Sequence, residues 1–318
     1  MVAANRRAGA SDYPPPVIGQ SNGRRRGEQI SRAEQPTRAR DTGRETTVSG
    51  ATSEREVVRL ESGRAEPVRD VLAVEEPCEI RIGDDPIAVT MRTPGHDAEL
   101  AAGFLFTEGL VGAGDIAAIS HCADDAALHP ENVVEVRLAP GRRPRRDLQR
   151  HFFASSSCGI CGKASIEAIH VDAPPAAAGP QVPAALLARM MEQLEARQSV
   201  FAATGGLHAA ALFSAAGEPL VVREDVGRHN AVDKAIGFAM LQEAMPLDRH
   251  VLLVSGRTSF EILQKALVAR IPLVAGVSAA SSLAAEFAAR SNMTLVGFLR
   301  PGKMNVYAGA ERIEGAID

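Results

Sequence analysis

The sequence contains no tryptophan and only two tyrosines, and aromatic residues make up 4% of its 318 residues. Proteins that bind nucleic acid combine aromatic side chains, on which bases stack, with a strongly basic surface for the phosphates. A formal net charge of −4 provides no such surface. We therefore expect no nucleic-acid partner for this chain.

Long apolar runs are also missing. No stretch reaches the roughly 18 consecutive apolar residues of a membrane-spanning helix, and the N-terminal arginines are not followed by the apolar core of a signal peptide. Four cysteines are too few for a disulfide scaffold in a chain of this length. We expect a cytoplasmic protein with no membrane partner, in which neighbouring cysteines act in catalysis or bind a metal.

Residues 1–55 differ in composition from the rest of the chain. They hold ten arginines, no lysine and six acidic residues, a net charge of +4, which leaves −8 for the remainder. The segment has no apolar periodicity and contains Pro14-Pro-Pro16 and Arg24-Arg-Arg26. Because it has too little apolar surface to offset the entropy of ordering, we predict an Arg-rich disordered tail. The alternatives are a basic docking arm and an organellar transit segment.

Two subdomains are predicted after the tail. Residues 56–175 form the first, with strand-like alternation at 57–60, 78–82, 87–91 and 133–138 and a helical pattern at 98–110. A linker rich in proline and alanine at 174–183 leads into the second, residues 176–318.

The second subdomain alternates helical patterns with short apolar runs. Helices are predicted at 184–197, 231–243, 261–269 and 283–290, and strands at 207–213, 220–223, 251–254, 273–277 and 295–298. Continuously apolar strands between helices are typical of a sheet that is covered on both faces and is at least partly parallel. We predict an α/β fold in which a mixed sheet carries helices on both faces, preceded by a smaller α+β subdomain.

The most distinctive local feature is Cys158-Gly-Ile-Cys161, set in a run that ends at Lys163. Two thiols at this spacing, flanked by glycines, suit sulfur or metal chemistry rather than packing. A zinc site would need Cys78, Cys122 or a histidine as further ligands, but Cys78 lies in a strand pattern and Cys122 in an expected loop. In a thioredoxin-like protein the cysteine pair would lie at the start of a helix that directly follows a strand. The serines before the pair indicate a loop and do not favour this alternative.

Two loops that follow apolar strands carry hydroxyl groups. Ser255-Gly-Arg-Thr-Ser259 and Ser278-Ala-Ala-Ser-Ser282 each lead from a strand into a helix. Ligands of open α/β sheets collect beyond the carboxyl ends of the strands, where helix N-termini present free N–H groups to anions. Capping alone would explain the serines, but two successive loops with Arg257 predict a phosphate-bearing ligand. Neither loop matches a Walker or dinucleotide-binding pattern.

The densest polar run of the sequence is Arg223-Glu-Asp-Val-Gly-Arg-His-Asn230. Its residues could cap a helix, or they could gather acid, base and anion-binding groups in a cleft. Our candidates for moving protons and positioning the ligand are Asp225, Arg228 and His229, since histidine titrates near neutral pH. For His208, which lies beside Gly205-Gly206, a role in the core and a role in a functional site are equally expected.

Several stretches together resemble the formate dehydrogenase accessory sulfurtransferase family, FdhD. The resemblance spans roughly residues 57–315 in collinear order, and a set of motifs in order is far more specific than any one of them. The matching stretches are Thr93-Pro-Gly-His-Asp97, Gly103-Phe-Leu-Phe-Thr-Glu-Gly109, Cys158-Gly-Ile-Cys161, Thr204-Gly-Gly-Leu-His208, Glu224-Asp-Val-Gly-Arg-His-Asn-Ala-Val-Asp-Lys234, Ser255-Gly-Arg257 and Gly297-Phe-Leu-Arg-Pro-Gly-Lys-Met-Asn-Val-Tyr307.

The resemblance implies a sulfur carrier needed for formate dehydrogenase activity. Such a protein takes persulfide sulfur from a cysteine desulfurase and passes it to the molybdenum cofactor, bis-molybdopterin guanine dinucleotide, before the cofactor enters formate dehydrogenase. The resemblance also implies a cytidine deaminase-like fold and a homodimer. It places the persulfide on Cys158, with Cys161 as its partner, and the cofactor contacts on Phe298, Leu299, Arg300, Pro301, Gly302 and Lys303.

The chemistry of the residues agrees with this role. A thiolate that attacks a donor persulfide needs a lowered pKa and exposure, which Lys163 and the loop N–H groups could provide for Cys158. We expect the cofactor phosphates over Ser255, Gly256, Arg257 and Ser278. The cofactor is then a bound substrate, and no permanently bound metal is expected.

Overall fold

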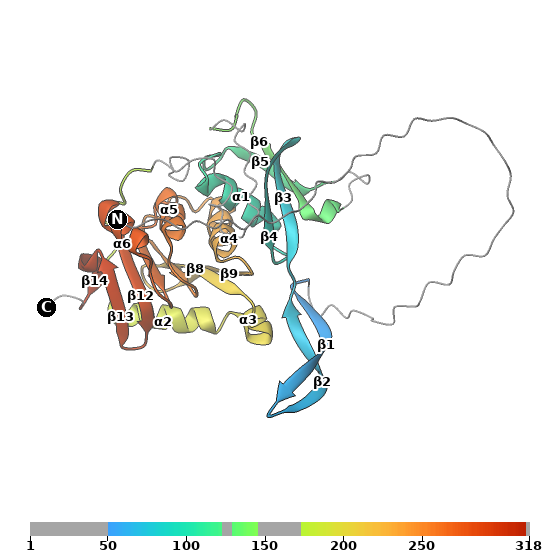
Figure 1. Cartoon of the computed structure of the whole chain (residues 1–318). Coiled ribbons are helices and arrows are strands. Elements are labelled where there is room, and N and C mark those ends of the chain that lie inside the picture. The colour runs from blue at the N-terminus through green and yellow to red at the C-terminus, as the bar shows by residue number, and fades with distance from the viewer. Residues whose placement is uncertain (1–49, 123–128, 146–172, 316–318) are drawn as a thin grey trace, which may run out of the picture. The chain divides into compact units, whose positions relative to one another are not determined.

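A computed structural model of the chain describes residues 50–122, 129–145 and 173–315 (Figure 1). The predicted tail, the Cys158–Cys161 pair and Lys163 lie outside these residues, except that Gly50 to Arg55 are described. Strand β1 begins at Thr52, a few residues inside the segment assigned to the tail. In the part of the chain that the structure describes, no helix is long and apolar enough to cross a membrane.

The central feature is a six-stranded sheet with the order β13-β12-β11-β10-β8-β9. Strands β10, β11 and β12 run parallel, and β13, β8 and β9 are added in antiparallel fashion. The bounds of its strands are β8 (His208–Ser214), β9 (Pro219–Asp225), β10 (His250–Val254), β11 (Leu273–Gly276), β12 (Thr294–Arg300) and β13 (Lys303–Ala308). The predicted mixed, partly parallel sheet is confirmed.

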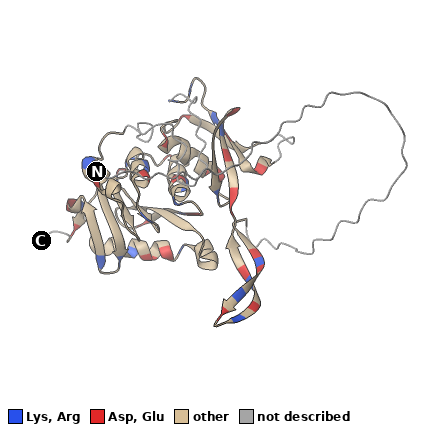
Figure 2. Cartoon of the chain, viewed as in Figure 1, with Lys and Arg blue, Asp and Glu red and all other residues tan. Residues whose placement is uncertain are grey.

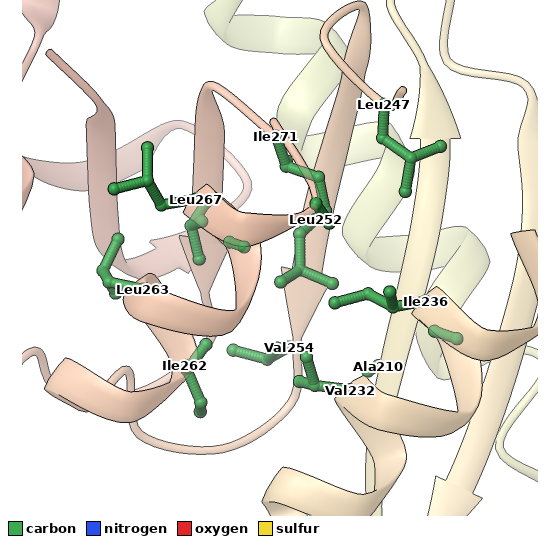
Figure 3. Close-up of a cluster of buried hydrophobic side chains, with 14 of the residues drawn as sticks. Ala210, Val232, Ile236, Leu247, Leu252, Val254, Ile262, Leu263, Leu267 and Ile271 are labelled. Atoms are coloured by element: carbon green, nitrogen blue, oxygen red, sulfur yellow. The ribbon is translucent and has the colours of Figure 1, made fainter. Parts of the chain in front are cut away.

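Helices cover both faces of this sheet. Alternate residues of β10 point to opposite sides: Leu252 and Val254 belong to one buried cluster, and Val251 and Leu253 to the other. The first cluster, shown in part in Figure 3, is closed by helices α4 (Arg228–Leu241), α5 (Phe260–Val268) and α6 (Ser282–Arg290). The second is closed by α2 (Ala184–Glu195). The coarse α/β class is therefore as predicted; the cytidine deaminase-like label stays an expectation.

A second, four-stranded sheet has the order β4-β3-β6-β5. Its strands are β3 (Glu76–Ile82), β4 (Asp85–Arg92), β5 (Ile116–His121) and β6 (Val133–Leu138), and helix α1 (Asp97–Thr107) packs on it through a third buried cluster. This layer corresponds to the predicted α+β part. The described residues nevertheless belong to one compact unit, and the boundary near 175 stays a prediction.

Helices α1 and α4 cross with almost no space between their backbones. A Cβ atom on Gly237 of α4 would overlap the carbonyl oxygen of Glu99 in α1, and one on Gly103 of α1 would overlap that of Asp233 in α4. Glycine is thus required on both helices, because only a residue without a side chain permits this approach.

A buried ion cluster lies beside the crossing. The Nζ of Lys265 is 2.9 Å from Asp233 Oδ2 and 3.4 Å from Glu108 Oε1, and it donates to the hydroxyl of Thr107 at 3.0 Å. Burial would lower the pKa of Lys265, but the charges of Asp233 and Glu108 raise it above its usual range. The lysine therefore stays charged and connects α5 to α1 and α4.

The segment predicted as a linker is fixed along the C-terminal half. Ala176 is buried and its N–H donates to Ser291 O at 2.8 Å. The guanidinium of Arg312 donates to the carbonyl oxygens of Ala177 and Ala178. Beyond it, β7 (Val182–Pro183) pairs in parallel with β14 (Ile313–Glu314). The proline-rich composition therefore indicated an irregular backbone correctly, but this backbone is packed.

Two further elements were not predicted as such. Strands β1 (Thr52–Glu61) and β2 (Arg64–Ala73) form a hairpin in which opposite charges face each other across the strands, as in Arg55–Asp70 and Arg59–Glu66. Both signs of charge alternate along it in Figure 2. The short helix α3 (Ser199–Thr204) contacts β2. Only residues 57–60 of this hairpin were expected as a strand.

The α1–α4 crossing predicts the effect of Gly237→Ala. In an exposed helix interior this change stabilises by up to about 1 kcal/mol, but here the new methyl group would meet the carbonyl of Glu99. We expect a loss of about 1–3 kcal/mol in the free energy of unfolding, measured by urea denaturation. The control is Gly50→Ala, where no atom lies within 4 Å of the added Cβ. Equal stability of Gly237→Ala and wild type would contradict the close crossing.

Candidate functional site

The strand directions bring several chain segments to one edge of the central sheet. The carboxyl ends of parallel β10, β11 and β12 meet there. Because β8 is antiparallel to β10, its first residue, His208, lies at the same edge, and in the β8–β9 register it faces Asp225. The loops that begin at Ser255 and at Val277 therefore start beside the ends of β8 and β9.

A cavity of about 840 Å³ opens at this edge. Its size is that of a pocket for a small-molecule ligand, about 300–1,000 Å³. Five of the residues predicted from the sequence line it: Arg228, Ser255, Gly256, Arg257 and Ser278. His208 lines it as well, and its role in a site stays a prediction.

The Ser255 loop is fixed against β8. The N–H of Ser255 donates to Ala209 O at 2.9 Å, and the Ser255 hydroxyl accepts from Ala209 N at 2.8 Å. A Cβ on Gly256 would come within 3.3 Å of Nδ1 in the His208 ring. The glycine thus lets the imidazole lie against the loop backbone, with Arg257 exposed next to it.

The Ser278 loop is joined to both of its neighbours. Thr258 N donates to Ala279 O at 3.1 Å, which connects it to the Ser255 loop, and Phe298 N donates to Ser278 O at 3.0 Å. The two loops also form a parallel bridge between Thr258 and Ala280. The two serine-containing loops are therefore one rigid wall of the cavity.

The predicted segment 298–303 borders this wall but does not line the cavity. The guanidinium of Arg300 donates to Val277 O at 2.8 Å, and Phe298 is exposed with a left-handed backbone, φ 51°. Such a conformation in a residue other than glycine stores strain and is found often at functional sites. Gly302, with φ 73°, makes the turn between β12 and β13.

Positive charge dominates the cavity near His208. Arg228 begins α4 and Arg257 follows β10, and both line the cavity. The Nε atom of Arg228 is buried without a hydrogen-bond partner among the described residues. Burial and the charges of these two arginines lower the pKa of His208 below its usual range, against the opposite effect of Asp225. The site thus offers two guanidinium groups and a neutral imidazole to an anion.

Asp225 is fully buried and does not line the cavity. Its Oδ1 accepts from Gly227 N at 2.8 Å and Asn230 Nδ2 at 2.9 Å, and its Oδ2 accepts from Thr93 N at 3.2 Å and lies 2.7 Å from Lys234 Nζ. Every lone-pair direction of the carboxylate is engaged. Its geometry is that of a positioning residue, which fixes the start of α4 and thereby Arg228.

Two stretches that the sequence presented separately are thus found to contact each other. Thr93, in the turn between β4 and α1, donates its N–H to Asp225, accepts from Val226 N through its hydroxyl, and accepts from Lys234 Nζ through its carbonyl. The turn that carries Asp225 therefore connects the four-stranded sheet layer to the central sheet layer, in addition to lying next to the site.

His229 is buried behind the cavity wall. Its Nε2 lies 3.2 Å from the Ser259 hydroxyl and 3.5 Å from Glu261 Oε2. Both partners belong to the start of α5, so the imidazole joins α4 to α5. A proton-carrying role for His229 stays a prediction.

The remaining cysteines do not resemble a reactive site. Cys78 is fully buried in β3, and burial raises the pKa of its thiol to about 12. Cys122 comes directly after His121, which is the last residue of β5. Among the residues that the structure describes, no group of three or more His, Cys, Asp and Glu side chains could hold a metal ion. Cys158 and Cys161 lie outside these residues.

Sequence reasoning missed several other residues that line the cavity. Glu195 and Gln198 come from the end of α2 and the turn after it, and Phe201 comes from α3. Phe201 is 43% exposed and offers an aromatic face next to the cavity. No motif marks these residues in the sequence.

The chain is similar to several known proteins. Residues 73–314 match the sequence model of the FdhD/NarQ family. The sulfur carrier protein FdhD of Mycolicibacterium paratuberculosis is 54% identical over 82% of this chain and 98% of its own length, and that of Mycobacterium tuberculosis is 50% identical over 83% and 99%. The crystal structure of a candidate formate dehydrogenase accessory protein from Desulfotalea psychrophila matches with a TM-score of 0.67 at 26% identity, over 83% of this chain and 99% of that one.

The hydrogen bonds of Asp225 predict that Asp225→Asn destabilises the fold. The change leaves Lys234, which is 1% exposed, without its charge partner, and breaking a buried ion pair costs about 3–5 kcal/mol. We expect a loss of about 3 kcal/mol in the free energy of unfolding, with exposed Glu192→Gln as the control. If Asp225→Asn were as stable as the wild type, Asp225 would not be the residue that holds the start of α4 against the β4–α1 turn.

Proposed function

The chain belongs to the FdhD/NarQ family, and we propose that it is a sulfur carrier protein that serves formate dehydrogenase. In the full proposal, persulfide sulfur comes from a cysteine desulfurase and goes to the molybdenum cofactor, bis-molybdopterin guanine dinucleotide, before that cofactor is inserted into formate dehydrogenase. The observation that carries the proposal is the cavity lined by Arg228, Arg257 and the two serine-containing loops.

The cavity has the features that a nucleotide pyrophosphate requires. Two guanidinium groups supply positive charge, and Arg groups can bind phosphate oxygens in pairs. The hydroxyls of Ser255 and Ser278 and the bare backbone at Gly256 add short-range donors and space for a close approach. Phe201, which also lines the cavity, offers a surface on which a base can stack. Segment 298–303, joined to Ser278, would extend the contact to the rest of the cofactor.

The sulfur step is assigned to the cysteine pair from the sequence. The Cys158 thiolate attacks the outer sulfur of the donor persulfide, so that a new S–S bond forms and the donor leaves as a thiolate. Attack of the Cys161 thiolate on the Cys158 sulfur would then form a disulfide and release the outer sulfur as hydrosulfide to the cofactor metal. The two cysteine sulfurs supply the two electrons that reduce the outer sulfur to hydrosulfide, and they are left oxidised as the disulfide.

The proposal also covers the cellular location of the protein, its oligomeric state and its partner proteins. It acts in the cytoplasm as a homodimer and binds its donor and recipient proteins in turn. The cofactor is a substrate in this scheme. Of the described residues, Arg228, Arg257, Ser255 and Ser278 would hold its phosphates, and none would bind its metal.

The persulfide assignment predicts the outcome for Cys158→Ala. After incubation with a cysteine desulfurase and cysteine, mass spectrometry of wild-type protein should show one added sulfur on the peptide that contains Cys158. Cys158→Ala should show none, because the attacking thiolate is gone. Cys122→Ala serves as the control and should load normally. Loading of Cys158→Ala at the wild-type level would refute the assignment, and stoichiometric zinc in the purified protein would favour a metal site instead.

The phosphate assignment predicts the outcome for Arg257→Gln. A charge-assisted hydrogen bond to a phosphate contributes about 1.5–3 kcal/mol, so the Kd for GDP measured by calorimetry should rise about 10- to 100-fold. The matched control is Arg290→Gln, an exposed arginine at the last position of α6, away from the cavity lining. Unchanged GDP affinity in Arg257→Gln would contradict the pyrophosphate site.

A further inference from the structure

His208 occupies an unusual position for a histidine. It is half-buried in the cavity wall with its ring against Gly256, and Arg228 and Arg257 line the same cavity. A group that can itself become a cation thus lines one cavity together with two permanent cations. Such an arrangement is unfavourable for imidazolium unless an anion enters.

The charged groups around the imidazole come from four elements. Arg228 from α4 and Arg257 from the loop after β10 oppose its protonation, and Asp225 from β9 favours it. Glu195, at the end of α2, lines the same cavity. The carboxylate of Asp225 is already paired with Lys234 Nζ at 2.7 Å. Burial is the first cause of the lowered pKa of the His208 ring in the free protein, and the charges of the two arginines lower this pKa further.

A bound pyrophosphate would reverse the effect of the two arginines. Its two negative charges would offset those of Arg228 and Arg257, and a phosphate oxygen beside His208 would be an acceptor for an imidazolium N–H. We propose that the cavity binds a nucleotide pyrophosphate together with one proton, and that His208 takes up this proton. The inference rests on the proposed function, since it concerns the same cavity.

The sign of the pH dependence follows from linkage. A group that gains a proton on binding makes the ligand bind more tightly as the pH falls, between its pKa in the complex and its pKa in the free protein. Below the pKa of the free protein His208 is already protonated, and the affinity becomes constant. The steepest dependence that one proton allows is about tenfold in Kd per pH unit. No covalent bond changes; the proton comes from the solvent.

The test requires a ligand that does not titrate itself. GDP-mannose meets this condition, because both of its phosphates are esterified and keep one negative charge each near neutral pH. Calorimetric titration at pH 7 in buffers of different ionisation enthalpy yields the number of protons taken up for each nucleotide bound. Wild-type protein should take up close to one proton, and its Kd should rise more than tenfold between pH 6 and pH 8.

Two variants separate His208 from the other histidines. His208→Asn should bind GDP-mannose with no proton uptake and with a flat pH profile. The control is His250→Asn: this histidine is also half-buried with a pKa lowered by burial, but it lies at the start of β10, at the opposite end of that strand from Ser255. It should keep the wild-type proton uptake.

Each outcome decides between the two claims. Binding without proton uptake in the wild type, or unchanged uptake in His208→Asn, overturns the role of His208 and leaves the pyrophosphate site intact. Absence of binding to either GDP or GDP-mannose overturns the cavity assignment and the present inference with it. If His208→Asn does not fold, an NMR titration of the His208 ring in wild-type protein decides instead: the proposal requires its pKa to rise when GDP-mannose is added.

Discussion

The carboxylate of Asp225 is the interaction on which the rest of the site depends. It is fully buried, and it accepts from the β4–α1 turn, from the backbone and side chain at the start of α4, and from Lys234. A buried charge is tolerable only when its partners are complete, so these segments must adopt one arrangement. That arrangement sets the position of Arg228 and, across the β8–β9 register, the surroundings of His208.

The sequence allowed the central sheet to be predicted because its strands are short, apolar and separated by helical patterns. Val251–Val254 and Leu273–Val277 are each within a residue of β10 and β11 as observed. Strand β2 was missed because charged residues are interspersed along it and because it contains Pro67, neither of which gives an apolar alternation. The crossing of α1 and α4 was also hidden, since a required glycine in a helix resembles any other unfavourable residue.

For the site, local chemistry could be predicted but long-range contacts could not. The hydroxyls and Arg257 after two strands indicated an anion-binding edge, and these residues do line one cavity. Asp225 and His229 were chosen for their chemistry, yet their contacts with Thr93 and Ser259 join segments of the fold. No pattern along the chain distinguishes a carboxylate that faces a ligand from one that faces a buried lysine. Glu195 and Phe201 gave no local signal.

The described residues that line the cavity fall between Glu195 and Ser278, whereas the paired cysteines are at 158 and 161. The paired cysteines and the described lining of the cavity are thus encoded in separate stretches of the chain. A substitution of either cysteine changes no residue of this lining, and a substitution in the lining changes neither cysteine. Selection can therefore act on the two stretches separately, although both belong to one chain.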